Sequence, residues 1–165
     1  MNCIIRKVKN GDESILAYVQ TESWKAGFKG ILTDEELVRC TDLTKTTHMY
    51  KKILDHHIGN GYILEVDGIA HCIAYWDKAR GVDEPDCAEL ICIHSLPNNW
   101  RKGFGTKMME QVLEDVKNAG YKKIMLWVFK DNMRARGFYE TSGFITTEKE
   151  KPNMIPIEIM YEKEL

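Results

Sequence analysis

The chain has 165 residues, of which 44% are hydrophobic and 29% charged, and its formal net charge is −2. This length allows one domain with a substantial core, so we expect a single domain over residues 1–165. The near-neutral charge gives no sign of a nucleic-acid-binding or membrane-binding surface, and no apolar run approaches the roughly 20 residues of a membrane span. We therefore expect a cytoplasmic protein with neither nucleic acid nor membrane as a partner.

In chain order, the first segments alternate between strand and helix patterns. Residues 3–8 predict a strand, and Asp12 is placed to cap a helix that closes near Gly27. Thr33 is placed to cap a short second helix. A third helix is expected over Thr44–His57.

A hairpin follows the third helix. Gly59-Asn60-Gly61 is expected to end that helix, and Asp67-Gly68 joins strands over residues 62–66 and 69–76. Asp-Gly between two apolar runs is a strong short-range hairpin signal. The sequence therefore predicts three antiparallel strands before residue 80.

The second half predicts a parallel strand pair. After a charged loop over residues 77–87, the predicted elements are a strand (88–96), a helix (104–119), a strand (123–129), a short helix (133–140) and two terminal strands (144–148 and 156–162). A strand-helix-strand crossover makes the two strands that it joins parallel. The fold class predicted from this order is α+β with a mixed, mostly antiparallel sheet.

The cysteines and histidines give no metal or disulfide signal. The five cysteines are odd in number and contain no C-x-x-C pair, which argues against a disulfide framework and a zinc site. Cys72 and Cys92 lie in apolar runs, where a free thiol behaves as a small buried hydrophobe. Adjacent helical positions point about 100° apart, so His56-His57 does not predict a metal site either.

A glycine-containing turn joins the strand over residues 88–96 to the helix that follows. Gly103 and Gly105 allow a tight turn, and the first free N–H groups of a helix attract an anion. Arg101, Lys102 and Lys107 add positive charge at the same point. The turn is therefore predicted to hold a phosphate group.

A nicotinamide or nucleotide enzyme is one alternative for this turn. The fingerprint G-x-G-x-x-G would need a third glycine where the chain has Met108, and the pattern G-x-x-x-x-G-K-[ST] does not occur. Asp131 is placed like a ribose-binding acid, but fewer than 40 residues follow it. That tail is too short for the further strand-helix units of a doubly wound fold.

Three segments resemble the GCN5-related N-acetyltransferases, which move an acetyl group from acetyl-coenzyme A to an amine. Glu89-Leu90-Ile91-Cys92-Ile93-His94-Ser95-Leu96-Pro97 is similar to that family's fourth strand. Trp100-Arg101-Lys102-Gly103-Phe104-Gly105 aligns with its pyrophosphate loop, [Q/R]-x-x-G-x-[G/A]. Asn132-x-x-Ala135-x-x-Phe138-Tyr139-Glu140-x-x-Gly143-Phe144 is similar to its later segment.

The resemblance implies a three-layer α/β/α fold whose two parallel strands splay apart at the donor site. Acetyl-CoA would be the acetyl donor, with no metal and no covalent acyl-enzyme. The residues implied in cofactor binding come from three places: the end of the fourth strand, the glycine-containing loop, and the segment after the fifth strand. They are Ile93, His94, Ser95, Arg101, Lys102, Gly103, Phe104, Gly105, Thr106, Asn132 and Tyr139.

The resemblance also implies catalytic residues. Tyr139 is the expected acid that protonates the departing thiolate, since a phenol with a reference pKa of about 10 suits a thiol leaving group. The incoming ammonium must lose a proton, and Glu89, through a water chain, and His94 are the two candidate bases. Phe138 is expected to take the core position beside Tyr139.

The sequence does not identify the acceptor amine. Trp100 replaces the usual Gln or Arg, and His94-Ser95 replaces the usual aromatic and β-branched pair. The resemblance implies walls of the acceptor site from Trp24, Phe28 and Ile31 and from the loop 149–156, and a core position is an equal alternative for the first three. The expected acceptor is a small-molecule or peptide amine, and a homodimer is a reasonable assembly. A non-catalytic acyl-CoA sensor or interaction module of the same fold is the alternative.

Overall fold

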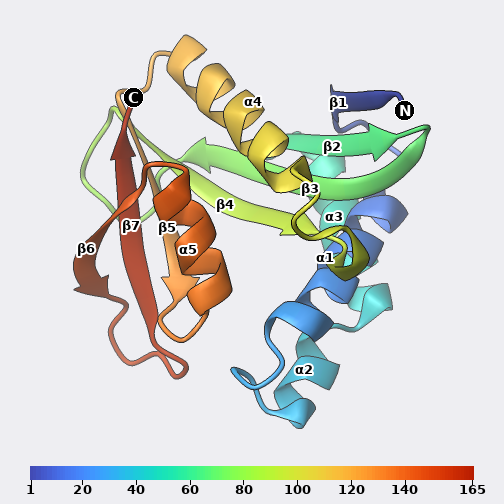
Figure 1. The fold of residues 1–165 in the computed structure, drawn as a ribbon, viewed down its shortest axis with the longest axis horizontal. Helices are drawn as coiled ribbons and strands as arrows, with labels where there is room; N and C mark the ends of the chain where they lie inside the picture. The colour runs from blue at the N-terminus through green and yellow to red at the C-terminus, as the bar shows by residue number, and fades with distance from the viewer.

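The computed structural model describes all residues from 1 to 165, and Figure 1 shows a mixed sheet packed between helices. In chain order the elements are β1 (Cys3–Lys7), α1 (Glu13–Gly27), α2 (Asp34–Cys40), α3 (Leu43–Asp55), β2 (Asn60–Val66), β3 (Ile69–Lys78), β4 (Cys87–Ser95), the 3-10 helix η1 (Pro97–Asn99), α4 (Phe104–Asn118), β5 (Lys123–Phe129), α5 (Met133–Thr141), β6 (Ile145–Glu150) and β7 (Glu158–Glu164). None of these helices is both long enough and apolar enough to cross a membrane.

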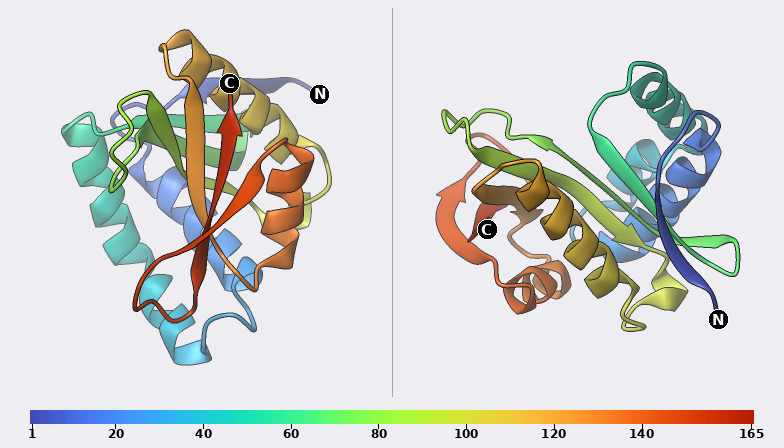
Figure 2. Two further views of the ribbon diagram at one scale, coloured as in Figure 1. Left: turned by 90° about the vertical axis from the view of Figure 1, so that its left-hand side faces the viewer. Right: turned by 90° about the horizontal axis from the view of Figure 1, so that it is seen from above.

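The sheet has seven strands in the order β1-β2-β3-β4-β5-β7-β6, and only β4 and β5 run parallel. Seen from above, α4 and α5 lie on one side of the sheet and α1 and α3 on the other (Figure 2). The largest core cluster lies under α4 and includes Met108, Val112 and Leu126, and the second largest lies under α1 and α3 and includes Leu16 and Tyr50. A third cluster has three residues, Cys87, Met125 and Met160. The predicted α+β class, three layers and mixed sheet are confirmed.

Most predicted elements are present, and their ends differ for local reasons. The predicted cap of α2 is confirmed, because Thr33 and Glu36 form a reciprocal capping box. Helix α3 begins at Leu43 rather than Thr44, because the Asp42 carboxylate accepts the Lys45 N–H at 2.9 Å and caps it. In the hairpin, Asp67 and Gly68 both have positive φ, as a two-residue type I′ turn requires.

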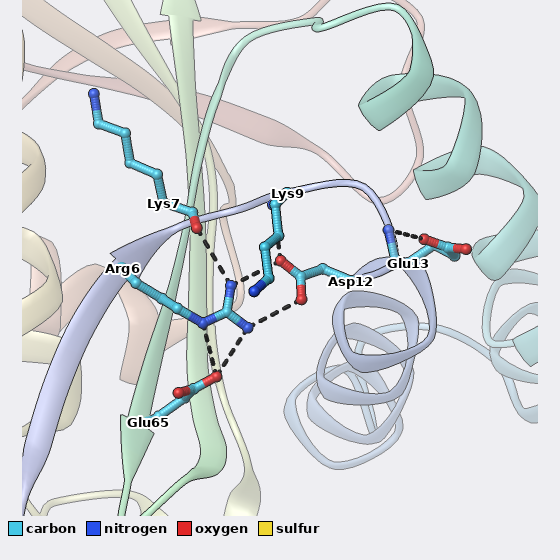
Figure 3. Close-up of polar contacts among 7 residues, drawn as sticks. Arg6, Lys7, Lys9, Asp12, Glu13 and Glu65 are labelled. Carbon is cyan, nitrogen blue, oxygen red and sulfur yellow. Dashed lines mark hydrogen bonds and ion pairs between the residues drawn. The ribbon is translucent and has the colours of Figure 1, made fainter.

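Asp12 stands before α1 as predicted, but its side chain does not cap the helix. Its carboxylate instead accepts two hydrogen bonds from Arg6, at 2.8 and 3.0 Å, and one from the Lys9 N–H (Figure 3). Arg6 also contacts Glu65 on β2 at 2.9 Å. Burial raises the pKa of Asp12, but the hydrogen bonds from Arg6 and Lys9 outweigh it and the pKa is lowered. Asp12 therefore joins the start of α1 to β1 and β2.

Gly61 lies inside β2 rather than in a helix-ending turn, and the ring of Tyr75 from β3 covers it. A Cβ on Gly61 would lie within 2.7 Å of three ring carbons of Tyr75. We expect Gly61→Ala to lower the free energy of unfolding by about 1–3 kcal/mol, the usual cost of overpacking. Urea unfolding measures this value.

Two further variants test that cause. In a Tyr75→Leu background the same Gly61→Ala change should cost much less, because the ring that it meets is gone; equal costs in both backgrounds would refute the steric explanation. Gly137 is the matched glycine, because a Cβ there meets nothing within 4 Å. Gly137→Ala should stabilise the protein by about 0.5–1 kcal/mol, since alanine favours a helix interior.

Candidate active site

The parallel strands β4 and β5 pair over only three positions. Cys87, Ala88 and Glu89 oppose Lys123, Ile124 and Met125, and there the ladder ends. Strand β4 runs on to Ser95 and β5 to Phe129, and their arrowheads point in different directions in Figure 1. Beyond Glu89 the facing edges of both strands therefore have backbone N–H and C=O groups without a strand partner.

A bulge in β4 helps to turn the strand away from β5. Trp76 opposes Leu90 and Tyr75 opposes Cys92, so Ile91 is the extra residue on β4. The bulge changes which side chains face α1: Leu90 packs in the core under α4, whereas Cys92 packs against the core under α1 and α3. Cys92 is half-buried rather than fully buried as Cys72 is, and burial raises the pKa of its thiol to about 12, which argues against a nucleophile.

The predicted phosphate loop joins η1 to α4. Arg101 and Gly103 have left-handed φ values of 63° and 82°, and Gly103 stands at the N-cap of α4 without a capping side chain. The first backbone bond back into the helix is from the Lys107 N–H to the Gly103 C=O. The backbone N–H groups of residues 101–106 donate to no protein atom, so six donors in a row are free for an anion.

Side chains around this loop fix its position. The buried Asn99 contacts the ring Nδ1 of His71 on β3, and its Oδ1 accepts from Lys102 Nζ at 3.1 Å. The indole N–H of Trp100 donates to the Ser95 C=O at 2.9 Å. The sequence analysis missed Asn99 and His71, because a contact between residues 28 positions apart leaves no local pattern.

Gly105 has a different role from Gly103. The position of its missing Cβ lies 3.4 Å from the ring of Phe138 on α5, whereas nothing lies within 4 Å of that position on Gly103. Gly105 therefore faces Phe138 across α4 and α5 with room for a Cβ in ordinary contact, and Gly103 supplies the left-handed turn.

Tyr139 lies on α5, and its ring contacts those of Phe138 and Phe144 at centroid distances of 5.6 and 6.0 Å. Both Phe138 and Tyr139 pack against the core under α4, whereas the sequence predicted this core position for Phe138 only. No protein group hydrogen-bonds the Tyr139 hydroxyl. Burial, followed by the effect of Cys92, raises the pKa of this phenol against the opposing charge of Arg134. The hydroxyl is therefore protonated at neutral pH.

His94 lies near the end of β4 and contacts α1. Its Nε2 accepts the indole N–H of Trp24 at 3.1 Å, and the two rings meet edge to face. Burial, and after it the charge of Arg134, lowers the pKa of His94 to about 4. The imidazole is therefore neutral at pH 7, and the lone pair of its Nε2 is already engaged.

Glu89 is the last residue of β4 that pairs with β5, and its side chain is buried. One carboxylate oxygen accepts from the backbone N–H and Nε of Arg80, both at 3.1 Å, and the other accepts from Nη2 at 2.8 Å. The Arg80 side chain is 69% exposed, so the pair borders on solvent. Glu89 and His94 oppose Asp77 and Ile73, which are four residues apart on β3, so they lie about 13 Å apart at the usual rise per residue.

Asn132 is buried and caps α5, because its Oδ1 accepts the Ala135 N–H at 3.2 Å. Its side-chain NH₂ has no protein partner. Arg134, two residues further on, rests on the face of the Trp100 indole with its guanidinium carbon 3.6 Å from the ring centroid. The sequence analysis did not single out Arg134, since a lone arginine in a helix gives no signal.

An aromatic cluster lies between the diverging strands and α1. The rings of Trp24 and Phe28 are 5.2 Å apart, and Phe28 meets Phe129 of β5 edge to face at 5.0 Å. The resemblance placed Trp24 and Phe28 in a wall of the acceptor site, and in the structure their rings form this cluster with Phe129. Nothing in these ring contacts involves Ile31 or the loop 149–156.

Comparison with known proteins identifies the family. A model described as the acetyltransferase (GNAT) family matches residues 22–144. The chain belongs to the GNAT family. The matched segment contains β4, the phosphate loop and α5, so the predicted membership is confirmed.

Curated relatives of this GNAT chain match parts of it. The chain is 35% identical to the uncharacterized protein YdhI of Bacillus subtilis over 86 residues, which cover 52% of this chain and 49% of YdhI. It is 27% identical over 139 residues to an uncharacterized N-acetyltransferase of Archaeoglobus fulgidus, a match that covers 82% of this chain and 88% of that one.

Solved structures share the fold of this GNAT chain. The PaiA N-acetyltransferase from Thermoplasma acidophilum, in complex with coenzyme A, matches with a TM-score of 0.82 and 20% identity over 100% of both chains. YncA from Salmonella typhimurium, solved with its cofactor acetyl-CoA, matches with a TM-score of 0.74 and 14% identity over 100% of this chain and 95% of that one. These likenesses support the fold.

Proposed function

We propose that this GNAT chain acts as a single domain that transfers an acetyl group from acetyl-CoA to a primary amine of a small molecule or peptide. The observation that carries the proposal is the run of six free backbone N–H groups over residues 101–106, which follow the far end of β4 after that strand has left β5. Such a run fits the pyrophosphate of a coenzyme A donor. The bound ligands of the PaiA and YncA structures support the same donor.

The free edge of β4 would hold the arm of the donor. Ile93, His94 and Ser95 follow the bulge, where β4 has β3 on one side and no strand on the other. An extended amide-containing chain can pair with such an edge as an added strand does. A backbone N–H there is available to the negative charge that develops on the carbonyl oxygen during attack.

The reaction forms one N–C bond and breaks one C–S bond. The ammonium of the acceptor gives up two protons and the departing thiolate takes one, so one proton is released overall. Tyr139, protonated at neutral pH, is the proposed donor of the thiol proton.

We assign the base that helps to deprotonate the acceptor to Glu89, acting through water, rather than to His94. The Nε2 of His94 is engaged by Trp24, and an imidazole with a pKa of about 4 holds a proton too weakly for this task. The rate should therefore show no inflection between pH 6 and 7, and Glu89→Gln should lower kcat by about 10²-fold. Such an inflection, lost in His94→Gln, would contradict this assignment.

Arg80→Gln is the matched control for Glu89→Gln. Both changes break the same ion pair, but only one removes the carboxylate. If Glu89 works as a base, Arg80→Gln should retain most of the activity lost in Glu89→Gln. Equal losses in both variants would assign a structural role to the pair.

A thiol-release assay with acetyl-CoA and a panel of primary amines tests the function itself. We expect amine-dependent release of coenzyme A, together with a rise in melting temperature when coenzyme A binds. Binding of coenzyme A without release for any amine would favour a non-catalytic acyl-CoA sensor. A rise in melting temperature with NAD but not with coenzyme A would instead favour a nucleotide enzyme.

A further inference from the structure

Arg134 is a guanidinium without an anionic partner. It forms no ion pair and no hydrogen bond with the protein, although it stacks on Trp100 at 3.6 Å. Arg6, Arg80 and Arg136 contrast with it, because each donates side-chain hydrogen bonds to named oxygen atoms. Stacking on an aromatic face leaves the N–H donors at the edge of a guanidinium free. The side chain of Arg134 therefore has N–H donors available for an anion.

Arg134 lies where the donor loop, α1 and the proposed proton donor meet. Its Nη2 lies 3.1 Å from the position that a Cβ on Gly27 would occupy, so a glycine at the end of α1 leaves room for it. Its charge acts on one titratable group of β4 and one of α5, because it lowers the pKa of His94 and opposes the rise at Tyr139. The free guanidinium thus lies between the phosphate loop and the end of α1.

No carboxylate of the chain forms an ion pair or a hydrogen bond with this guanidinium. The groups that shift the pKa values of His94, Tyr139 and Arg134 include no aspartate or glutamate. The carboxylate of Glu89, further along β4, is held by Arg80. A second ammonium on a polyamine would therefore meet a like charge here, which costs binding energy.

Apolar rings lie next to the guanidinium. Trp24 lies in the last turn of α1 with Gly27, Phe28 is the C-cap of that helix, and Phe129 of β5 contacts the Phe28 ring. All three rings are half-buried and keep part of their surface free. The surroundings therefore combine one unpaired cation with an apolar wall, which suits a ligand that carries a negative group beside an apolar group.

We propose that Arg134 binds a carboxylate on the acceptor, so that the preferred acceptors are α-amino acids with apolar side chains. This inference rests on the proposed acetyl transfer. The in-plane donors of a guanidinium match both oxygens of a carboxylate. Pairing also neutralises the carboxylate, whose charge would otherwise hold the proton on the neighbouring ammonium. Arg134 would then both select the acceptor and ease its deprotonation.

Matched pairs of amines test this proposal. Phenylalanine with phenethylamine, and leucine with 3-methylbutylamine, differ only in the carboxylate. With saturating acetyl-CoA, we expect kcat/KM to be about 10- to 100-fold higher for the amino acid of each pair, in line with a charge-assisted hydrogen bond. Arg134→Gln should remove this preference and leave the KM for acetyl-CoA unchanged.

Arg136→Gln is the control on the same helix, because Arg136 contacts Tyr161 and the Lys130 C=O instead of the site. It should keep the preference for the amino acid. Equal or faster acetylation of the decarboxylated amines by the unmodified protein would overturn the proposal. So would an Arg134→Gln variant that keeps the preference but raises the KM for acetyl-CoA, since Arg134 would then bind the donor phosphates. No thiol release with any amine would overturn acetyl transfer itself.

Discussion

Replacing Tyr139 with phenylalanine should lower kcat by about 10²-fold or more and leave the Kd for acetyl-CoA nearly unchanged. The ring keeps its contacts with Phe138 and Phe144, so the variant loses little beyond the hydroxyl. That hydroxyl has no protein partner, and its loss therefore leaves no buried group unsatisfied. Steady-state kinetics and calorimetry with acetyl-CoA measure the two quantities.

The pH dependence gives a second test of Tyr139. Because burial raises its pKa above the usual value of about 10, the phenol stays protonated up to at least pH 10, and the rate should not fall below that pH through its ionisation. Tyr18→Phe is the control, since Tyr18 is 52% exposed on α1. Unchanged turnover in Tyr139→Phe would remove this residue from the mechanism.

Gly105→Glu should abolish the binding of acetyl-CoA. The new side chain would collide with Phe138 or enter the loop, and its negative charge would lie beside the free N–H groups of residues 101–106. Calorimetry with coenzyme A measures the loss, and circular dichroism checks the fold. An unchanged affinity would refute the assignment of the loop.

Two variants separate charge and bulk in that result. Asn118→Glu adds the same charge at the other end of α4 and should leave binding intact. Gly105→Ala adds only a Cβ, 3.4 Å from the Phe138 ring, which is ordinary contact, and should bind coenzyme A with an affinity close to the original. Loss of binding in Gly105→Ala would show that packing against α5, rather than charge, controls the loop.

Local signals in the sequence predicted the elements around the site. Asp67-Gly68 encodes its turn through positive φ angles, and Thr33 with Glu36 encodes a capping box. The crossover from β4 through α4 to β5 made the two strands parallel, as predicted. Gly103 indicated the position of the phosphate loop, because the loop needs a left-handed φ there and glycine adopts this conformation most easily.

Long-range partners were beyond these signals. Asp12 has the residue type of a helix cap, but Arg6 and Glu65 create an ion network that takes up its carboxylate. The bulge at Ile91 depends on the pairing of β4 with β3, and the sequence of β4 alone gave no sign of it. The engagement of His94 by Trp24 joins residues 70 positions apart, so the low basicity of this histidine could be found only in the folded chain.

The order of strands has a consequence for folding during synthesis. Strand β7 leaves the ribosome after the other six strands, yet it lies between β5 and β6 and pairs with every residue of β5. Until residues 158–164 emerge, β5 can pair only through its three positions on β4, and β6 has no neighbour at all. The half of the sheet that carries β5 must therefore assemble after translation of β7, and the emerging chain exposes an unpaired edge that favours aggregation until then.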